Sequence, residues 1–236
     1  MEKNDWIMTT KNKASKDKCR IKVCKNGPYL VYGKIPLEEQ IIHANKQGDS
    51  DVWLVGEKYA MQENSILCRC GQSKKRPFCD NTHLKINFNG TETASREPYL
   101  HQAEEIDGPT LKLNDAKNLC ASARFCDRAG TIWNLIPQSD KTEIRKISIE
   151  EVSNCPSGRL VVWDKKTGKV IEPDFERSIG LVEDPAVGVS GPIWVCGGIP
   201  IESADDTTYE IRNRVTLCRC GKSSNKPFCD SSHYPE

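Results

Sequence analysis

Cysteine and histidine residues recur at the same intervals in two distant parts of the chain. Each set follows the pattern Cys-x-Cys-x8-Cys-x3-His. The two sets are Cys68, Cys70, Cys79 and His83, and Cys218, Cys220, Cys229 and His233. Three thiolates and one imidazole make a complete set of four ligands for a metal centre. The spacing therefore predicts two metal centres of the same kind.

Both sets lie in an internal repeat. Residues 67–83 and 217–233 agree at 11 of 17 positions without a gap, and residues 27–37 resemble residues 191–201. Agreement of this extent does not arise by chance, so the chain contains one module twice. The first copy is about 14 residues longer between these two matching parts.

Zinc is the first alternative for these sites, because three cysteines and a histidine suit tetrahedral zinc. Structural zinc sites usually place about two to four residues between paired cysteines, and Cys-x-Cys is tighter than that. The residues resemble the CDGSH iron-sulfur family, whose signature is Cys-x-Cys-x2-(Ser/Thr)-x3-Pro-x-Cys-Asp-Gly-(Ser/Ala/Thr)-His. Ser73 and Ser223 fill the hydroxyl position, whereas Asn81 and Ser231 stand where the signature has glycine.

The resemblance implies a 2Fe-2S cluster in each module. One iron would bind Cys68 and Cys70 and the other Cys79 and His83, with Cys218, Cys220, Cys229 and His233 arranged likewise. A neutral imidazole in place of a thiolate makes such a cluster less negative and raises its reduction potential. It also makes the site sensitive to acid, because a ligating nitrogen must be unprotonated. We therefore expect mild acid to bleach both clusters.

A different cysteine pattern lies between the modules. Five residues separate Cys120 from Cys126, as they separate the first and third cysteines of 4Fe-4S ferredoxins, and Ala123 takes the place of the second. Cys155 begins the sequence Cys-Pro-x-Gly-x-Leu. The segment resembles the divergent mono-cluster 4Fe-4S ferredoxin family. Three cysteines suffice for a 3Fe-4S cluster. A 4Fe-4S cluster would take a fourth ligand from solvent, from a carboxylate such as Asp127, or from a remote residue. Three unrelated buried cysteines are the alternative.

The composition suits a chain of small modules. Of 236 residues, 37% are hydrophobic and 28% charged, which favours two or three modest domains over one large core. The 34 basic and 33 acidic residues nearly cancel, so no net field attracts nucleic acid or an anionic membrane. Residues 1–18 are polar and basic, and no apolar run reaches the length of a membrane span. We expect a reducing, cytoplasmic setting, in which clustered cysteines hold metal more often than disulfides.

Short strands are expected to position the ligands. Residues 39–43 and 51–55 predict a hairpin, as do residues 159–163 and 169–172. The spacing of Ser148 and Glu151 predicts a capping box for a short helix that runs toward Cys155. The fold class is α+β, with two small β-rich CDGSH modules that flank a ferredoxin-like α+β segment. The expected division is a flexible polar tail at 1–16, modules at 17–100 and 189–236, and the ferredoxin-like segment at 101–188.

The sequence shows no phosphate-binding loop, nucleophilic triad or pair of catalytic carboxylates, which weighs against a self-contained enzyme. We expect an electron-transfer or redox-sensing protein with two 2Fe-2S clusters and one 3Fe-4S or 4Fe-4S cluster. Its partner would be a redox protein or an apo-protein that accepts a cluster. Cluster storage and transfer is the second hypothesis, which a labile histidine ligand permits, and a zinc scaffold is the third.

Basic residues crowd the cysteine loops and predict either a solvated face or a positive rim for an acidic redox partner. They are Arg69, Arg219, Lys74, Lys75, Arg76, Lys222 and Lys226. The two modules are expected to pack together as a pseudo-dimer within one monomer, rather than to form an obligate homodimer. We also expect the clusters to stabilise the fold of these small modules, so that loss of iron unfolds them.

Overall fold

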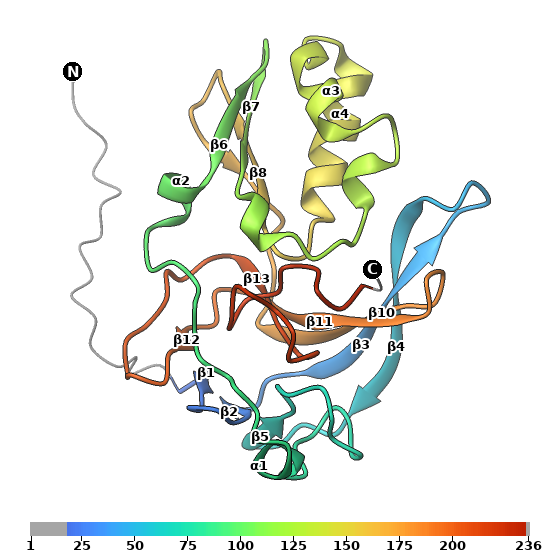
Figure 1. The fold of residues 1–236 in the computed structure, drawn as a ribbon. Coiled ribbons are helices and arrows are strands. Elements are labelled where there is room, and N and C mark those ends of the chain that lie inside the picture. Colours follow the sequence, from blue (N-terminus) through green and yellow to red (C-terminus); the bar gives the residue numbers. More distant parts are fainter. Residues whose placement is uncertain (1–17, 235–236) are drawn as a thin grey trace.

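Residues 18–234 contain three β-sheets and a few short helices, which confirms the α+β class (Figure 1). The structure is a computed structural model that describes residues 18–234. The polar tail expected at residues 1–16 therefore lies outside the described residues. None of the helices in the described part of the chain combines the length and the apolar character that crossing a membrane requires.

The first repeat supplies five strands and one helical turn. They are β1 (Arg20–Val23), β2 (Tyr29–Tyr32), β3 (Leu37–Ala44), β4 (Ser50–Tyr59), β5 (Asn64–Leu67) and α1 (Thr82–Lys85). The expected hairpin at residues 39–43 and 51–55 is confirmed, because β3 and β4 pair antiparallel. These strands account for the extra length of the first repeat.

The middle region contains its own sheet and most of the helical residues. Its elements are α2 (Tyr99–Gln102), β6 (Glu104–Asp107), β7 (Leu111–Asp115), η1 (Lys117–Leu119), η2 (Phe125–Asp127), α3 (Ile132–Leu135), η3 (Ile136–Gln138), α4 (Thr142–Ser153), β8 (Leu160–Asp164) and β9 (Val170–Ile171). The sheet order is β6-β7-β8-β9. The expected second hairpin is confirmed as β8 and β9.

The predicted capping box at Ser148 and Glu151 is wrong, although a helix does lead to Cys155. Helix α4 begins at Thr142, six residues earlier. Ser148 lies inside the helix, where its hydroxyl donates to the carbonyl of Ile144 at 2.8 Å. Glu151 instead accepts from the backbone amide of Ala129 at 2.9 Å. A serine that bonds back to the preceding turn satisfies itself within a helix and does not mark its start.

The last part of the chain supplies four strands, which are β10 (Ser178–Asp184), β11 (Val189–Cys196), β12 (Ile201–Glu202) and β13 (Arg214–Leu217). They complete two sheets together with the first repeat, in the orders β12-β1-β2-β5 and β13-β11-β10-β3-β4. Residues of β10 fall within the segment 101–188 of the expected division, and their strand pairs with β3 and β11.

The two repeats exchange strands and so share both sheets. Strand β12 pairs in parallel with β1, and β3 pairs in parallel with β10. The strand that leads into each cysteine loop pairs with the equivalent strand of its own repeat. Strand β5 pairs with β2, where Leu67 faces Tyr29, and β13 pairs with β11, where Leu217 faces Ile193. Tyr29 also donates from its hydroxyl to the carbonyl of Cys218 in the second loop at 2.8 Å. The repeats therefore form one unit within the chain.

Strand exchange also produces one hydrophobic core for both repeats. Residues of this core include Ile21, Leu67, Ile179, Ile193 and Leu217, each exposed by 1% or less. The composition did not indicate a core of this extent, which arises because the apolar faces of both repeats meet. The middle region has a separate core around Leu111, Leu113, Ile132, Ile136, Val152, Leu160 and Val162.

The hairpin of β3 and β4 connects the first repeat to the middle region. Trp53 of β4 stacks on Phe125 with ring centroids 4.8 Å apart and contacts Trp194 of β11 at 4.9 Å. Its indole nitrogen donates to the carbonyl of Asn154 at 3.3 Å. In Figure 1 the middle region lies at one end, β10 and β11 lie in the centre, and β5 with α1 lies at the other end. The hairpin thus helps to hold the region that contains the third set of cysteines.

Candidate metal centres

The first predicted set of ligands is brought together as two pairs. Strand β5 ends at Leu67 and delivers Cys68 and Cys70, whose sulfurs lie 3.8 Å apart. Helix α1 carries His83, and its Nδ1 lies 3.4 Å from the sulfur of Cys79. The expected approach of Cys79 and His83 is therefore present in the structure.

The second set repeats this arrangement. The sulfurs of Cys218 and Cys220 are 3.6 Å apart, and the sulfur of Cys229 lies 3.5 Å from Nδ1 of His233. Residues 231–234 form a turn here, where the first module has the short helix α1. The ligand pairs thus keep their spacing although the local backbone differs.

The pair distances fit metal ligation. Two thiolates bound at about 2.3 Å to one tetrahedral metal lie about 3.8 Å apart, and a thiolate and an imidazole about 3.6 Å apart. Within residues 18–234, no three His, Cys, Asp or Glu side chains converge as ligands of a single ion. The donors of each module form two pairs, and a 2Fe-2S cluster assigns one pair to each of its irons.

The loop between the pairs has the same internal bonds in both modules. The hydroxyls of Ser73 and Ser223 donate to the carbonyls of Phe78 and Phe228 at 2.6 and 2.8 Å. They also accept from the amides of Lys75 and Asn225 at 3.1 and 3.0 Å. The hydroxyl position of the signature therefore closes the loop.

In both modules, the residue at the glycine position of the signature has a left-handed backbone conformation. Asn81 has φ +67° and Ser231 has φ +74°. Glycine adopts this conformation without strain, and asparagine tolerates it better than most residues. The carboxylates just before this position accept backbone amides, Asp80 from Thr82 at 3.0 Å and Asp230 from Ser232 at 3.1 Å. These bonds turn the chain back so that histidine meets cysteine.

The two cysteine loops pack against each other through glycines. A side chain at Gly71 would place its Cβ 2.5 Å from the carbonyl oxygen of Cys220. A side chain at Gly221 would place its Cβ 2.6 Å from the carbonyl oxygen of Cys70. Only glycine permits this reciprocal approach, so the two candidate centres are neighbours across the pseudo-symmetric unit.

Arg69 and Arg219 are not part of a basic rim, contrary to one expectation. Arg69 is buried and donates to the carbonyls of Cys24 and Gly90 at 3.2 and 2.7 Å. Arg219 donates to the carbonyl of Val182 at 2.6 Å. Both guanidinium groups point inward because they satisfy backbone carbonyls around the loops. The exposed basic residues near the first loop are Lys74, Lys75 and Arg76, and Lys222 is exposed near the second.

Burial opposes ionisation at most of these ligands. It raises the pKa of the Cys79 and Cys229 thiols, and it lowers the pKa of His233 with help from the positive charge of Arg219. The hydrogen bond with Cys220 lowers the pKa of Cys218 to about 6. A buried thiol that resists ionisation in the free protein becomes a thiolate when a metal binds, so binding releases protons.

The third predicted set lines one cavity of about 140 Å³. Cys120, Cys126 and Cys155 all contribute to its wall, as do Ala123 and Asp127. A single water needs about 10 to 15 Å³, so this space accepts a group of several heavy atoms. Burial raises the pKa of Cys126 to about 12. The structure therefore gathers the three cysteines and keeps Asp127 beside them.

Two polar side chains approach these cysteines. The hydroxyl of Ser157 lies 3.5 Å from the sulfur of Cys155. Arg159 pairs with Asp115 through two bonds of 2.6 and 2.8 Å and lines the same cavity as Cys120. Although burial lowers the pKa of Arg159, these hydrogen bonds raise it. A fixed positive charge therefore lies beside the cavity that the three cysteines line.

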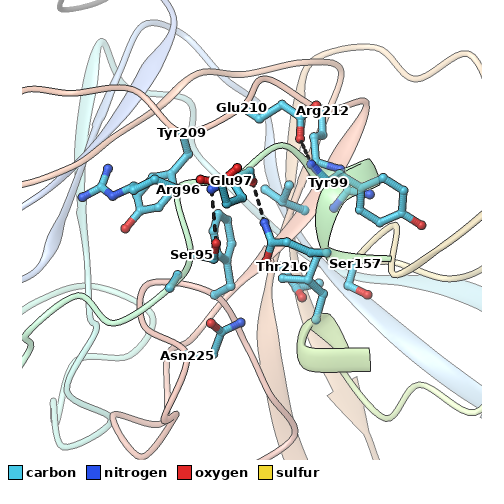
Figure 2. A pocket seen from close by; sticks show the side chains of 15 residues that line it. Ser95, Arg96, Glu97, Tyr99, Ser157, Tyr209, Glu210, Arg212, Thr216 and Asn225 are labelled. Carbon is cyan, nitrogen blue, oxygen red and sulfur yellow. Dashed lines mark hydrogen bonds between the residues drawn. The ribbon is translucent and has the colours of Figure 1, made fainter. Parts of the chain in front are cut away.

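A smaller cavity of about 30 Å³ separates the 94–102 segment from β13 (Figure 2). Arg212 stacks over the ring of Tyr99 at 3.9 Å, and the Tyr99 amide donates to Glu210 at 2.6 Å. The buried Nη1 of Arg212 has no partner within residues 18–234. This space suits one or two water molecules and is too small for a cofactor.

The sequence did not reveal that the second module contacts the middle cysteines. Ser231 donates to the carbonyl of Cys120 at 2.8 Å, although 111 residues separate them. The one available signal was the departure from glycine at Ser231, which marks an added side chain but not its partner.

Comparisons with known proteins match these regions. The family model for the iron-binding zinc finger of CDGSH type matches residues 26–84 and 190–234, and that for the divergent 4Fe-4S mono-cluster matches residues 106–165. CDGSH iron-sulfur domain-containing protein 1 of Rattus norvegicus and that of Mus musculus are each 38% identical over 64 residues. This match covers 25% of the chain and 59% of each relative. No solved structure matches the chain.

Proposed function

Since two regions of this chain are of the CDGSH iron-binding type and the region between them is a divergent 4Fe-4S mono-cluster segment, we propose that the protein binds three clusters. We propose that it uses them for electron transfer or redox sensing. The family matches support an iron-sulfur cluster-binding protein. The number and type of clusters and their use are our proposal.

The donor pairs carry this proposal. In each repeat two pairs stand at the separations of 3.4 to 3.8 Å that two ligands of one tetrahedral iron would take. Cys68, Cys70, Cys79 and His83 would hold one 2Fe-2S cluster, and Cys218, Cys220, Cys229 and His233 the other. When bound, such clusters accept and release single electrons. The loops hold the ligands in position and exclude water from most of them.

The middle cavity supports a third cluster of the 3Fe-4S or 4Fe-4S type. Cys120, Cys126 and Cys155 would be its ligands, and Asp127 lines the same cavity as a candidate fourth. Arg159 supplies a positive charge next to Cys120, which favours the more negative, reduced state of a bound group. The protein would work in a reducing, cytoplasmic compartment as a carrier and not as a self-contained enzyme.

The exposed Lys74, Lys75 and Arg76 suit an acidic redox partner. An absorption spectrum of anaerobically purified protein, followed by reduction with dithionite, tests the proposal. We expect coloured protein whose absorbance decreases on reduction and returns on reoxidation in air. A colourless protein that contains zinc would contradict the proposal and support the zinc scaffold.

Cluster transfer to apo-proteins is the second candidate. One observation favours it, because Leu84 is 68% exposed and lies next to His83, the ligand expected to leave most easily. An exposed apolar residue beside a labile ligand suits a transient protein contact. Incubation with an apo-ferredoxin separates the two functions. Transfer of iron and sulfide to the apo-protein supports cluster delivery, whereas exchange of electrons alone supports the carrier function.

A further inference from the structure

A single residue bridges the second module and the middle cysteines. The hydroxyl of Ser231 donates to the backbone carbonyl of Cys120 at 2.8 Å. Ser231 also lies two residues after Cys229, a candidate ligand of the second centre. Candidate ligand residues of two centres are therefore connected through the short backbone from Cys229 to Ser231 and one hydrogen bond.

Further bonds fix this contact from both sides. Ser122 donates from its hydroxyl to Ser231 at 2.7 Å, and the Tyr234 hydroxyl lies 3.1 Å from the carbonyl of Ser122. Asn225 of the second loop donates to the carbonyl of Asn118 at 2.8 Å. Several hydrogen bonds between the same two segments restrict their relative motion, so the two candidate centres keep a fixed relation.

Asp184 of β10 completes the contact. It accepts from the hydroxyl of Tyr234 at 2.8 Å and from the guanidinium of Arg124 at 2.6 Å. Ser122 and Arg124 both have positive φ, at +51° and +60°. Backbone in this region persists for such residues only where the surroundings hold it. The loop from Cys120 to Cys126 is therefore shaped against the second module.

The first module lacks the equivalent bridge. Asn81 takes the place of Ser231, and its amide lies 3.4 Å from the sulfur of Cys79. Its side chain is exposed and makes no hydrogen bond to another residue of the described chain. The second module contacts both other candidate centres, because Ser231 bonds to Cys120 and Cys220 packs on Gly71 of the first loop.

We infer that Ser231 provides the path along which single electrons pass between the middle centre and the second module. This inference rests on the proposed function. In each transfer the donor centre is oxidised by one electron and the acceptor centre is reduced by one, while no bond forms or breaks and the Ser231 proton stays in place. A one-electron donor protein supplies the electron and a one-electron acceptor protein removes it. The rate of electron tunnelling falls less steeply with distance along bonded atoms than across empty space. The hydrogen bond from Ser231 to Cys120 joins the two loops where such a space would otherwise lie.

Ser231→Gly tests the path in the intact, cluster-loaded protein. Glycine restores the residue of the family signature and suits φ +74°, so the backbone keeps its shape while the bond to Cys120 is lost. Asn81→Gly is the matched control, because it makes the same change in the first module. Tyr234→Phe, which removes the bond to Ser122, is a second probe of the same contact.

The readout is the redistribution of one electron after a flash of photochemical reduction, followed by absorbance and by low-temperature electron paramagnetic resonance (EPR). His233→Cys, prepared in each background, identifies the signal of the second module through its altered spectrum. We expect Ser231→Gly to slow redistribution between the middle centre and the second module several-fold, Tyr234→Phe to slow it less, and Asn81→Gly to leave it unchanged.

Two results would overturn the inference. One contradicts the path alone, and the other contradicts the proposed function as well. Redistribution at the wild-type rate in Ser231→Gly, in protein with about seven or eight irons, contradicts the path and leaves the proposed function intact. Protein with only about four irons contains no middle cluster, which contradicts the three-cluster function and the path together.

Discussion

The two repeats hold the same ligands in the same loop, yet their surroundings differ. In the first module, the third cysteine and the histidine lie near Cys24, and a Cβ on Gly27 would come within 3.8 Å of Nε2 of His83. In the second, Ser231, which lies between the equivalent cysteine and histidine, bonds to Cys120 of the middle cysteine loop. Duplication thus supplies two similar candidate centres, which have different neighbours.

Surface chemistry follows the same division. The first loop has exposed Lys74, Lys75 and Arg76, while the second has Ser224, Asn225 and Lys226 at these positions. Asn225 is used to bind the middle region. We therefore expect the first module to meet an external partner and the second to be the internal connection. Four changes test this contrast.

The largest effect is expected from Leu67→Ala and Leu217→Ala. These matched residues precede the two cysteine loops and lie in the shared core with exposures of 1% and 0%. Each change should lower the free energy of unfolding by about 2 to 5 kcal/mol. Because the core is shared, urea unfolding should lose both modules in one transition. Two separate transitions would show that the modules are independent.

His83→Cys and His233→Cys test the acid sensitivity of each module. A histidine ligand binds without its proton, so each pH unit below its pKa weakens its hold about tenfold, or about 1.4 kcal/mol. Burial and Arg219 lower the pKa of His233, so the second module should bleach only below the ordinary value of about 6.5. Each variant should slow acid bleaching of its own module. Unchanged bleaching of the double variant would exclude histidine ligation.

Ala123→Cys tests the middle site and its neighbour. Ala123 lines the cavity with Cys120, Cys126 and Cys155, so a cysteine there should favour a four-iron cluster. The iron content should rise by about one where the wild type holds a 3Fe-4S cluster. The EPR signal of the second module should change while that of the first does not. An unchanged low-temperature spectrum would contradict the ferredoxin alignment.

Asp230→Asn should have the smallest effect. Burial favours the neutral acid, but hydrogen bonds from Ser232 and Ser224 hold the pKa of Asp230 at about 2. This folded pKa lies below the unfolded value of about 3.9, so its stabilising contribution is complete above about pH 4 and is lost as the pH falls toward 2. The variant should lose about 1 kcal/mol at pH 7.

The pH of half-bleaching should not move in Asp230→Asn, because this carboxylate stays ionised throughout the range in which histidine titrates. Asp80→Asn is the matched change in the first module and should likewise leave it unmoved. A shift of one pH unit or more in either variant would assign acid sensitivity to the carboxylate instead of the histidine.

The local features of the centres could be predicted from the sequence. The spacing of Cys79 and His83 fixes their approach within one turn, and the turn chemistry between β3 and β4 fixes that hairpin. Such features depend on residues close together in the chain. The repeat itself identified which residues form each set.

Long-range features were not predictable in the same way. The periodicity of one strand does not show that β3 pairs with β10, or that Ser231 meets Cys120. Charge alone suggested that Arg69 lies on a rim, whereas the carbonyls of Cys24 and Gly90 turn it inward. A buried arginine is placed by its partners, and these come from distant parts of the chain.

Iron and inorganic sulfide analysis of anaerobically purified protein tests the central claim, three metal centres on one chain, most directly. Two 2Fe-2S clusters and one 3Fe-4S or 4Fe-4S cluster predict about seven or eight irons and about eight sulfides per chain. About four irons and four sulfides would contradict the middle centre, and zinc without sulfide would contradict all three.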